Sequence, residues 1–210
     1  MRRWLCLPLA AAAACSPERA APSPLITSSP LPQRQEHAGP RFRKVAAKDS
    51  GIAFQNELRR ENVIAYVYSG AGCAVGDYDG NGLPDLYLVS QDGPNRLYRQ
   101  VAKWKFEDVT EKAGGLDGGD AWGKAATFVD FDGDADLDLY VCNTQSKNLL
   151  YVNQGDGTFV ERAGAFGAAV TAASTGAAFA DYDKDGDLDL FVLTNRVFGP
   201  NLPPELVAEV

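Results

Sequence analysis

An acidic segment that occurs three times is the feature that most constrains the fold of this chain. In its middle copy, residues 130–139 read DFDGDADLDL, with an aspartate at every second position from Asp130 to Asp138. In an extended strand these side chains would share one face. Two unscreened carboxylates about 4 Å apart repel by roughly 4 kcal/mol at the effective dielectric of a protein surface. The pattern therefore predicts a loop folded around a positive charge rather than a strand.

The acidic segment belongs to a longer internal repeat. Its other copies are DYDGNGLPDL at residues 77–86 and DYDKDGDLDL at residues 181–190, so that the three starts lie 53 and 51 residues apart. Two further phrases return at an offset of 53 residues: NRLY at 95–98 as NLLY at 148–151, and FEDV at 106–109 as FVER at 159–162. A weaker copy of the second phrase, FRKV, stands at 42–45. A period near 50 residues indicates a propeller or a solenoid.

Short apolar runs flank each acidic segment and predict strands, because they are rich in β-branched and aromatic residues and are bounded by Gly, Asp and Asn. They occupy residues 72–76, 125–129 and 176–180 upstream, and 85–89, 138–142 and 189–193 downstream. The Asn-x-Leu-Tyr and Phe phrases supply two more strands, and about four strands make one propeller blade. We therefore predict an all-β fold: a partial, open or truncated β-propeller of about three four-stranded blades with calcium-binding loops.

The acidic loops have the composition of calcium sites. Ca²⁺ takes about six to eight hard oxygen ligands, which a tight loop supplies from alternate residues. Counted from the first aspartate, positions 1, 3, 5 and 9 offer side-chain oxygens, and position 7 offers its backbone carbonyl. The predicted ligands are Asp77, Asp79, Asn81, Leu83 and Asp85 in loop 1; Asp130, Asp132, Asp134, Asp136 and Asp138 in loop 2; and Asp181, Asp183, Asp185, Asp187 and Asp189 in loop 3.

Other interpretations of the loops are weaker. An EF-hand needs a bidentate glutamate at position 12, where this chain has Leu88, Val141 and Val192. Mg²⁺ prefers to keep several waters, and Zn²⁺ selects Cys and His. Acidic turns without a metal remain the alternative, because Asp, Asn and Gly dominate turns in general. At position 6, Ala135 replaces the glycines of loops 1 and 3, although this position favours a left-handed backbone.

The repeated phrases resemble the FG-GAP/VCBS-type repeats that form the calcium-loop blades of integrin α-subunit propellers. DYDGNGLPDLYL and NLLYVNQGDGTF are most similar to the secreted branch related to cartilage acidic protein and to ASPIC/UnbV-type bacterial proteins. The resemblance extends over roughly residues 42–196. It implies a non-catalytic extracellular β-propeller used for adhesion or ligand binding, and it carries the family's metal ligands over to the side chains at positions 1, 3, 5 and 9.

The N-terminal region predicts export. Residues 1–15 combine two arginines, a short apolar run and small residues, as a signal peptide does. The sequence AAAC at 12–15 resembles a bacterial lipobox, so the alternatives are a lipid anchor at Cys15 in the cell envelope and plain secretion. Residues 16–40 are rich in Pro, Ser and Ala and predict a linker that includes His37, the single histidine. Repeats then extend over 41–196, and 197–210 is an irregular tail of a chain that we expect to be truncated.

Charge and composition restrict the function. The net charge of −8 argues against nucleic acid or an anionic membrane surface as the partner, because both need a basic face. The favoured function is binding of an extracellular protein or glycan. The alternative is an accessory or framing domain of a calcium-dependent, glycan-active hydrolytic enzyme, although no nucleophile and base stand together. We also expect self-association through exposed blade edges. Cys73 and Cys142 are either disulfide-bonded or buried free thiols.

Overall fold

The computed structural model describes residues 42–58 and 70–195. The predicted signal peptide, Cys15, the linker with His37, and the tail lie outside these described residues. The chain divides into two units, Met1–Arg43 and Lys44–Val210, and all the strands lie in the second. No helix of the described residues is long and apolar enough to cross a membrane.

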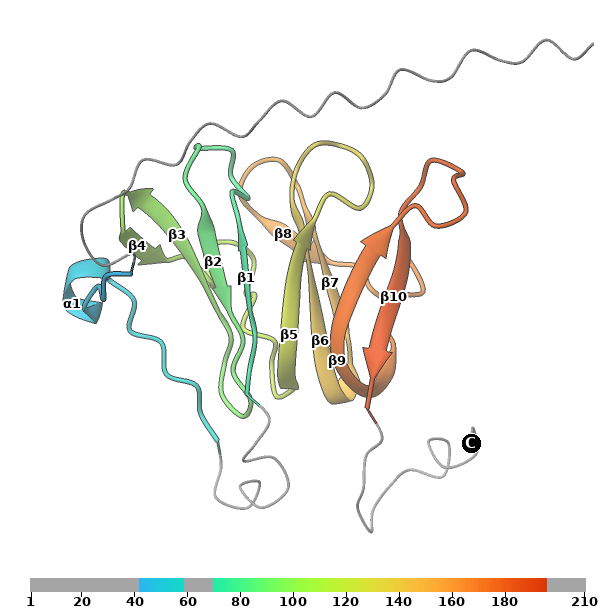
Figure 1. Ribbon diagram of the computed structural model, residues 1–210, viewed down its shortest axis with the longest axis horizontal. Helices are drawn as coiled ribbons and strands as arrows, with labels where there is room; N and C mark the ends of the chain where they lie inside the picture. Colours follow the sequence, from blue (N-terminus) through green and yellow to red (C-terminus); the bar gives the residue numbers. More distant parts are fainter. Residues whose placement is uncertain (1–41, 59–69, 196–210) are drawn as a thin grey trace, which may run out of the picture. The chain divides into compact units, whose positions relative to one another are not determined.

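The first repeat forms a four-stranded antiparallel sheet in the order β1-β2-β3-β4, as a propeller blade does (Figure 1). Its strands are β1 (Cys73–Gly76), β2 (Asp85–Leu88), β3 (Arg96–Ala102) and β4 (Lys105–Asp108). The second repeat adds β5 (Trp122–Val129), β6 (Asp138–Lys147), β7 (Leu149–Asn153) and β8 (Phe159–Glu161), paired in the same antiparallel order. These two repeats confirm the prediction of four-stranded blades.

The third repeat is smaller within the described residues. It contributes β9 (Thr171–Ala180) and β10 (Asp189–Thr194), an antiparallel pair rather than four strands. The end of β6, from Thr144 to Lys147, also pairs with β9, so the second and third repeats share one sheet. The architecture is therefore all-β and consistent with an open part of a propeller, as predicted.

The weak FRKV copy at 42–45 does not form a strand, and Phe42 is exposed. The turn that follows FRKV nevertheless has the same position as the turn that follows the Phe phrase at 106–109. The short helix α1 (Ala47–Ser50) ends at Gly51, which has φ 83° and lies so close to the carbonyl of Phe106 that a Cβ would collide with it. Gly114 approaches the carbonyl of Phe159 in the same way one repeat later. The close approach explains the glycine at both turns.

Two apolar cores lie between successive blades. The first contains Tyr87 and Val89 of one blade and Leu139 and Val141 of the next. The second contains Tyr140 and Cys142 and is covered by side chains of β9 and β10. Tyr87 and its counterpart Tyr140 are fully buried, and their hydroxyls donate to the carbonyls of Leu116 (2.7 Å) and Ala168 (2.9 Å). Both tyrosines thus bury their rings between blades while their hydroxyls keep a hydrogen-bond acceptor.

The two predicted strand cysteines are separate free thiols. Cys73 is exposed on β1, whereas Cys142 is buried in the second core. Burial raises the pKa of the Cys142 thiol to about 11. Of the two alternatives that the sequence left open, the structure has no disulfide between them.

Candidate metal centres

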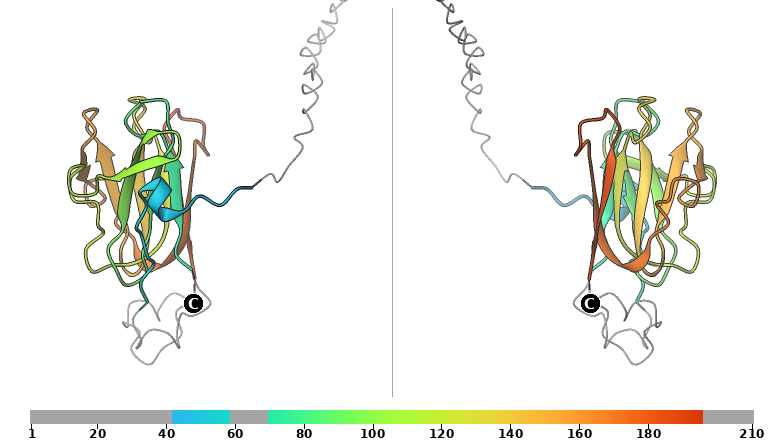
Figure 2. Two further views of the ribbon diagram at one scale, coloured as in Figure 1. Left: turned by 90° about the vertical axis from the view of Figure 1, so that its left-hand side faces the viewer. Right: turned by 90° about the vertical axis from the view of Figure 1, so that its right-hand side faces the viewer.

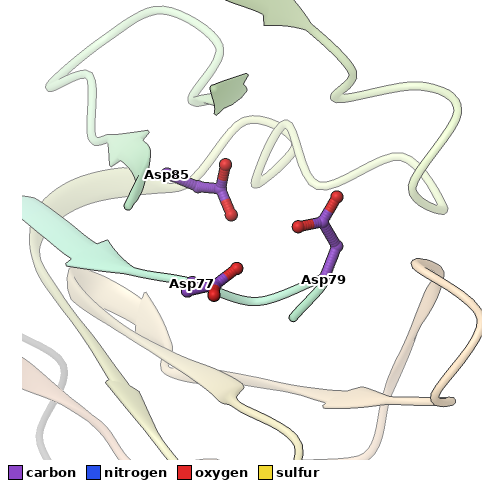
Figure 3. A group of neighbouring side chains, drawn as sticks. All are labelled: Asp77, Asp79 and Asp85. Atoms are coloured by element: carbon purple, nitrogen blue, oxygen red, sulfur yellow. The ribbon is translucent and has the colours of Figure 1, made fainter. Parts of the chain in front are cut away.

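The three acidic loops lie at one end of the sheets, where they join β1 to β2, β5 to β6 and β9 to β10 (Figures 1 and 2). In every loop the carboxylates at positions 1, 3 and 9 converge, with one oxygen of each within 4.8 Å of the others. Figure 3 shows this arrangement in loop 1, where Asp85 at the start of β2 faces Asp77 and Asp79. The groups are Asp77, Asp79 and Asp85; Asp130, Asp132 and Asp138; and Asp181, Asp183 and Asp189.

Hydrogen bonds from the loop backbone hold the position 1 carboxylates. The N–H groups of Asn81 and Gly82 donate to Asp77 (3.0 and 2.7 Å). In loop 2 the N–H groups of Gly133 and Ala135 donate to Asp130 (2.8 and 3.1 Å). Each carboxylate thus closes the turn that carries the next ligands, so the same residues shape the loop and supply its charge.

The side chains at position 5 accept hydrogen bonds from the loop backbone. In each loop the side-chain oxygen at position 5 accepts a hydrogen bond from the backbone N–H at position 7. The N–H of Leu83 donates to Asn81 (2.8 Å), that of Asp136 to Asp134 (2.9 Å) and that of Asp187 to Asp185 (3.0 Å). The converging groups of acidic side chains consist of positions 1, 3 and 9. Ligation by positions 5 and 7 stays a prediction.

Positions 4 and 6 adopt a left-handed backbone in all three loops. Gly82, Ala135 and Gly186 at position 6 have φ of 83°, 76° and 102°. The expectation for Ala135 is confirmed: a residue with a Cβ occupies a conformation that favours glycine. The sequence analysis missed the same requirement at position 4, where Lys184 has φ 63° and its counterparts are Gly80 and Gly133.

Position 9 connects loops 1 and 2 to the third strand of each blade. The buried Asp85 accepts the N–H of Tyr78 (3.1 Å) and of Gln100 in β3 (2.7 Å). The buried Asp138 accepts the N–H of Phe131 (3.2 Å) and of Asn153 in β7 (2.8 Å). Burial raises the pKa of both carboxyl groups to about 6, against these hydrogen bonds, which lower it. Two buried carboxyl groups thus lie beside other carboxylates, an arrangement that a bound cation would stabilise.

Within the described residues, the position 9 carboxylate of loop 3 is not buried and has no hydrogen bond from a third strand. Asp189 is exposed, and its carboxylate accepts a hydrogen bond from the N–H of Tyr182 (2.8 Å). The difference follows from the strand content of the blades, because β3 and β7 supply the second donor in loops 1 and 2 and the described part of the third repeat has no such strand.

Asn153 links two neighbouring loops, a role that the sequence analysis missed. Its side-chain amide donates to the carbonyl of Tyr78 in loop 1 (2.9 Å) and to the carbonyl of Leu137 in loop 2 (3.1 Å). Tyr78 is itself buried against Phe159, with ring centroids 5.4 Å apart. The two loops are therefore held in fixed relation by one side chain of β7.

Arg99 of β3 forms an ion pair with Asp79, the position 3 carboxylate of loop 1. In the described part of the chain, no Lys or Arg is paired with an aspartate of loops 2 or 3. The pair was not foreseen, because Arg99 looks like an ordinary polar residue of a strand in the NRLYRQ phrase. Loop 1 thus differs from loop 2 by one positive side chain paired with a carboxylate of the converging group.

The donor set fits a calcium ion. The converging atoms are carboxylate oxygens, with amide and carbonyl oxygens close by in the same turns. Ca²⁺ prefers such hard oxygen ligands, whereas Zn²⁺ prefers nitrogen and sulfur. A bound ion would be held by positions 1, 3 and 9 and would supply the charge that offsets three converging carboxylates.

Blade-like antiparallel sheets that repeat every 50 residues or so, joined by acidic loops at one end, define a β-propeller repeat protein. The model of the FG-GAP-like repeat matches residues 77–141 and 130–192, which together span more than half of the sequence. The chain therefore belongs to the FG-GAP-like repeat family, and the resemblance seen in its phrases is confirmed.

The chain is also similar to a curated protein. The chain is 25% identical over 144 residues to cartilage acidic protein 1 of Mus musculus. The aligned part covers 67% of this chain and 22% of the relative. The aligned part of the chain thus corresponds to about a fifth of that protein.

Proposed function

We propose that this chain is a non-catalytic, calcium-binding repeat module that binds an extracellular protein or glycan. The observation that carries the proposal is the convergence of three carboxylates in each of three loops at one end of the sheets. Membership of the FG-GAP-like repeat family supports it. Calcium has a structural role in this proposal, because it would neutralise the loops and fix the surface that they present.

Calcium is expected to raise the melting temperature of the full chain. An ion that binds the folded state alone stabilises it by about 2.7 kcal/mol per site at 100 times its dissociation constant. Extracellular calcium modules bind at about 10⁻⁴ to 10⁻³ M, and each kcal/mol shifts melting by about 2–4 °C in a chain of this size. We therefore expect a rise of at least 5 °C or so in 10 mM calcium, measured by scanning calorimetry, with 10 mM magnesium as the control.

Isothermal titration calorimetry provides the second measurement for the same prediction. It should detect heat of calcium binding with more than one ion bound per chain. A chain that shows neither heat nor a shift in melting with calcium would overturn the proposal.

The stability of the calcium-free chain should fall as the pH rises from about 4 to 6.5. Asp85 and Asp138 have folded-state pKa values of about 6, above the ordinary value of 3.8. Between these values the folded state binds more protons than the unfolded state, so raising the pH destabilises it. Urea denaturation in calcium-free buffer at several pH values would measure the slope.

The same two groups predict the opposite trend when calcium is present. Protons compete with the ion for Asp85 and Asp138, so calcium affinity should fall as the pH drops below about 6. Asp138→Asn should reduce the slope seen without calcium. A calcium-free stability that rises steadily over this pH range would show that these carboxyl groups do not govern it.

A predicted export signal supports the extracellular setting of the proposed function. Residues 1–15 have the composition of a signal peptide, and the sequence AAAC at 12–15 resembles a lipobox, which would place a lipid on Cys15. Labelling of cells with a radioactive fatty acid would distinguish a lipid-anchored form from a secreted one.

Ligand binding and the enzyme alternative are separated by a direct comparison. The similarity to cartilage acidic protein 1, by its name a protein of cartilage, supports an extracellular partner for the module. Immobilised glycans and extracellular proteins should retain the calcium-loaded chain without being altered. Release of sugar from a glycan array would favour the alternative, a domain of a calcium-dependent glycan-active hydrolase.

A second copy of the chain is also a proposed partner. The third blade exposes apolar side chains at positions that are buried between blades in the first two repeats.

A further inference from the structure

Arg99 distinguishes loop 1 from loop 2. We propose that Arg99 acts as an internal competitor of calcium at loop 1, so that loop 2 binds calcium more tightly and loop 1 binds only when the guanidinium leaves Asp79. The proposal rests on the proposed calcium binding and adds an order of affinity among the loops. The regulated ligand is the divalent cation, and the regulating group is a side chain of the same blade.

The contact itself supports competition. The Nε of Arg99 pairs with Asp79, whose carboxylate is one of the three that converge in loop 1. The Asp79 side chain is 11% exposed, whereas the Arg99 side chain is 42% exposed. The guanidinium of an arginine is protonated at any physiological pH. A permanent positive charge therefore lies against one of the proposed ligands and repels a second cation.

The second repeat provides an internal comparison. The residue that corresponds to Arg99, 53 positions later, is Val152. Position 5 is the neutral Asn81 in loop 1 and the acidic Asp134 in loop 2. The amide of Asn81 also donates to the carbonyl of Gln100 in β3 (3.3 Å), next to Arg99. Loop 1 thus has one carboxylate fewer at these positions and one cation more, and both differences lower its attraction for Ca²⁺.

Space is present for the displaced side chain. A cavity of about 490 Å³ lies beside loop 1 and is lined by Asp79, Arg99, Lys112, Asp136 and Asp156, among others. The guanidinium can therefore move from Asp79 into a polar, solvent-connected space without disturbing the apolar cores. Asp136 and Asp156 offer carboxylates within the same lining.

An opposite role for Arg99 would be to orient Asp79 as a ligand. A positioning residue would strengthen calcium binding, so its removal would weaken the site. Competition predicts the reverse, a tighter site after removal. The sign of the change therefore decides between the two roles.

The test compares Arg99→Gln with the parent in the full chain. Loops 2 and 3 are silenced by Asp130→Asn and Asp181→Asn, and calcium binding at loop 1 is followed by isothermal titration calorimetry. We expect Arg99→Gln to lower the dissociation constant about tenfold, which corresponds to about 1.4 kcal/mol. The matched control is Arg96→Gln, which removes the Arg96–Asp108 ion pair (3.3 Å) on the same strand outside the loop and should leave the constant unchanged.

A gain of competition can be tested as well as a loss. Val152→Arg in a chain with loop 1 silenced by Asp77→Asn should weaken calcium binding at loop 2 about tenfold. Circular dichroism in calcium-free buffer would verify that each variant is folded. An Arg99→Gln variant that binds calcium equally or more weakly at loop 1 would overturn the proposal while leaving calcium binding intact. Absence of calcium heat from the unaltered chain would instead overturn the proposed function.

Discussion

Replacement of Asp138 by alanine is expected to abolish calcium binding at loop 2 and to destabilise the calcium-free chain. The buried carboxylate lies in the converging group and accepts the N–H groups of Phe131 and Asn153 (3.2 and 2.8 Å). Loss of one of three converging carboxylates should weaken the site at least 100-fold or so. The buried N–H of Asn153 and the partly buried N–H of Phe131 also lose their acceptor, at about 1–3 kcal/mol each, partly offset because a buried charge is removed. We expect a net loss of about 2–3 kcal/mol in urea denaturation.

Position 9 of loop 3 offers a control for the structural part of this effect. Asp189→Ala removes the equivalent carboxylate from its converging group, but Asp189 is exposed and accepts a single backbone hydrogen bond among those described, from Tyr182 (2.8 Å). It should lose calcium at loop 3 with a folding cost below about 1 kcal/mol.

Position 7 of loop 2 offers a control for the metal part. Asp136→Ala keeps the backbone carbonyl that the sequence predicts as the ligand, so its calcium affinity should change less than about tenfold. Calorimetric titration of each variant measures the affinity. Equal loss of calcium from Asp136→Ala and Asp138→Ala would show that the assignment of positions 7 and 9 is incorrect.

Much of the fold was predictable because the recurring acidic segments and apolar runs show where the strands begin and end. The runs around residues 72–76 and 85–89 became β1 and β2, and their counterparts 53 residues later became parts of β5 and β6. A hairpin with a short loop depends mainly on local sequence. The three copies of the pattern therefore form the same hairpin, β1–β2, β5–β6 and β9–β10. The FRKV copy at 42–45 shows where prediction from the repeat fails. Phe42 matches the phenylalanine that begins the other copies, but it is exposed and lies outside any strand.

The loop chemistry was predictable in part, and the missing part is long-range. The convergence of positions 1, 3 and 9 follows from a tight turn. The burial of Asp85 depends on the N–H of Gln100, 15 residues away, and the bridge between loops depends on Asn153, 75 residues from Tyr78. Arg99 contacts Asp79 because β3 passes beside the loop. None of these contacts can be predicted from the spacing of the aspartates.

The exposed face of the third blade carries the last prediction. Phe191 and Leu193 of β10 correspond to Tyr87 and Val89 in the first repeat and to Tyr140 and Cys142 in the second. Those counterparts are at most 1% exposed, whereas Phe191 is 68% and Leu193 is 57% exposed. An apolar face that is fully covered twice within the chain is thus open to solvent at β10, where it favours association.

The first blade exposes the face that, in the next two repeats, packs against the preceding blade. Val75 of β1 is 59% exposed, and its counterparts Phe128 and Phe179 pack against the first and second cores. Within the chain, the Tyr87 side of one blade meets the Phe128 side of the next. A second copy can therefore repeat this contact by placing its β1 face on the β10 face of the first copy. Such a head-to-tail contact is heterologous, so it continues beyond two copies.

Sedimentation velocity of the calcium-loaded full chain should consequently show a sedimentation coefficient that rises with concentration. Phe191→Asp should shift the chain to monomers, because it removes an apolar side chain whose burial contributes about 1.5–3 kcal/mol and places a charge in the contact. Val160→Asp is the matched control, since Val160 is 40% exposed on β8, away from the β1 and β10 faces, and should associate like the parent. A parent chain that stays monomeric at every concentration would refute the head-to-tail contact, whereas equal association of both variants would place the contact on another surface.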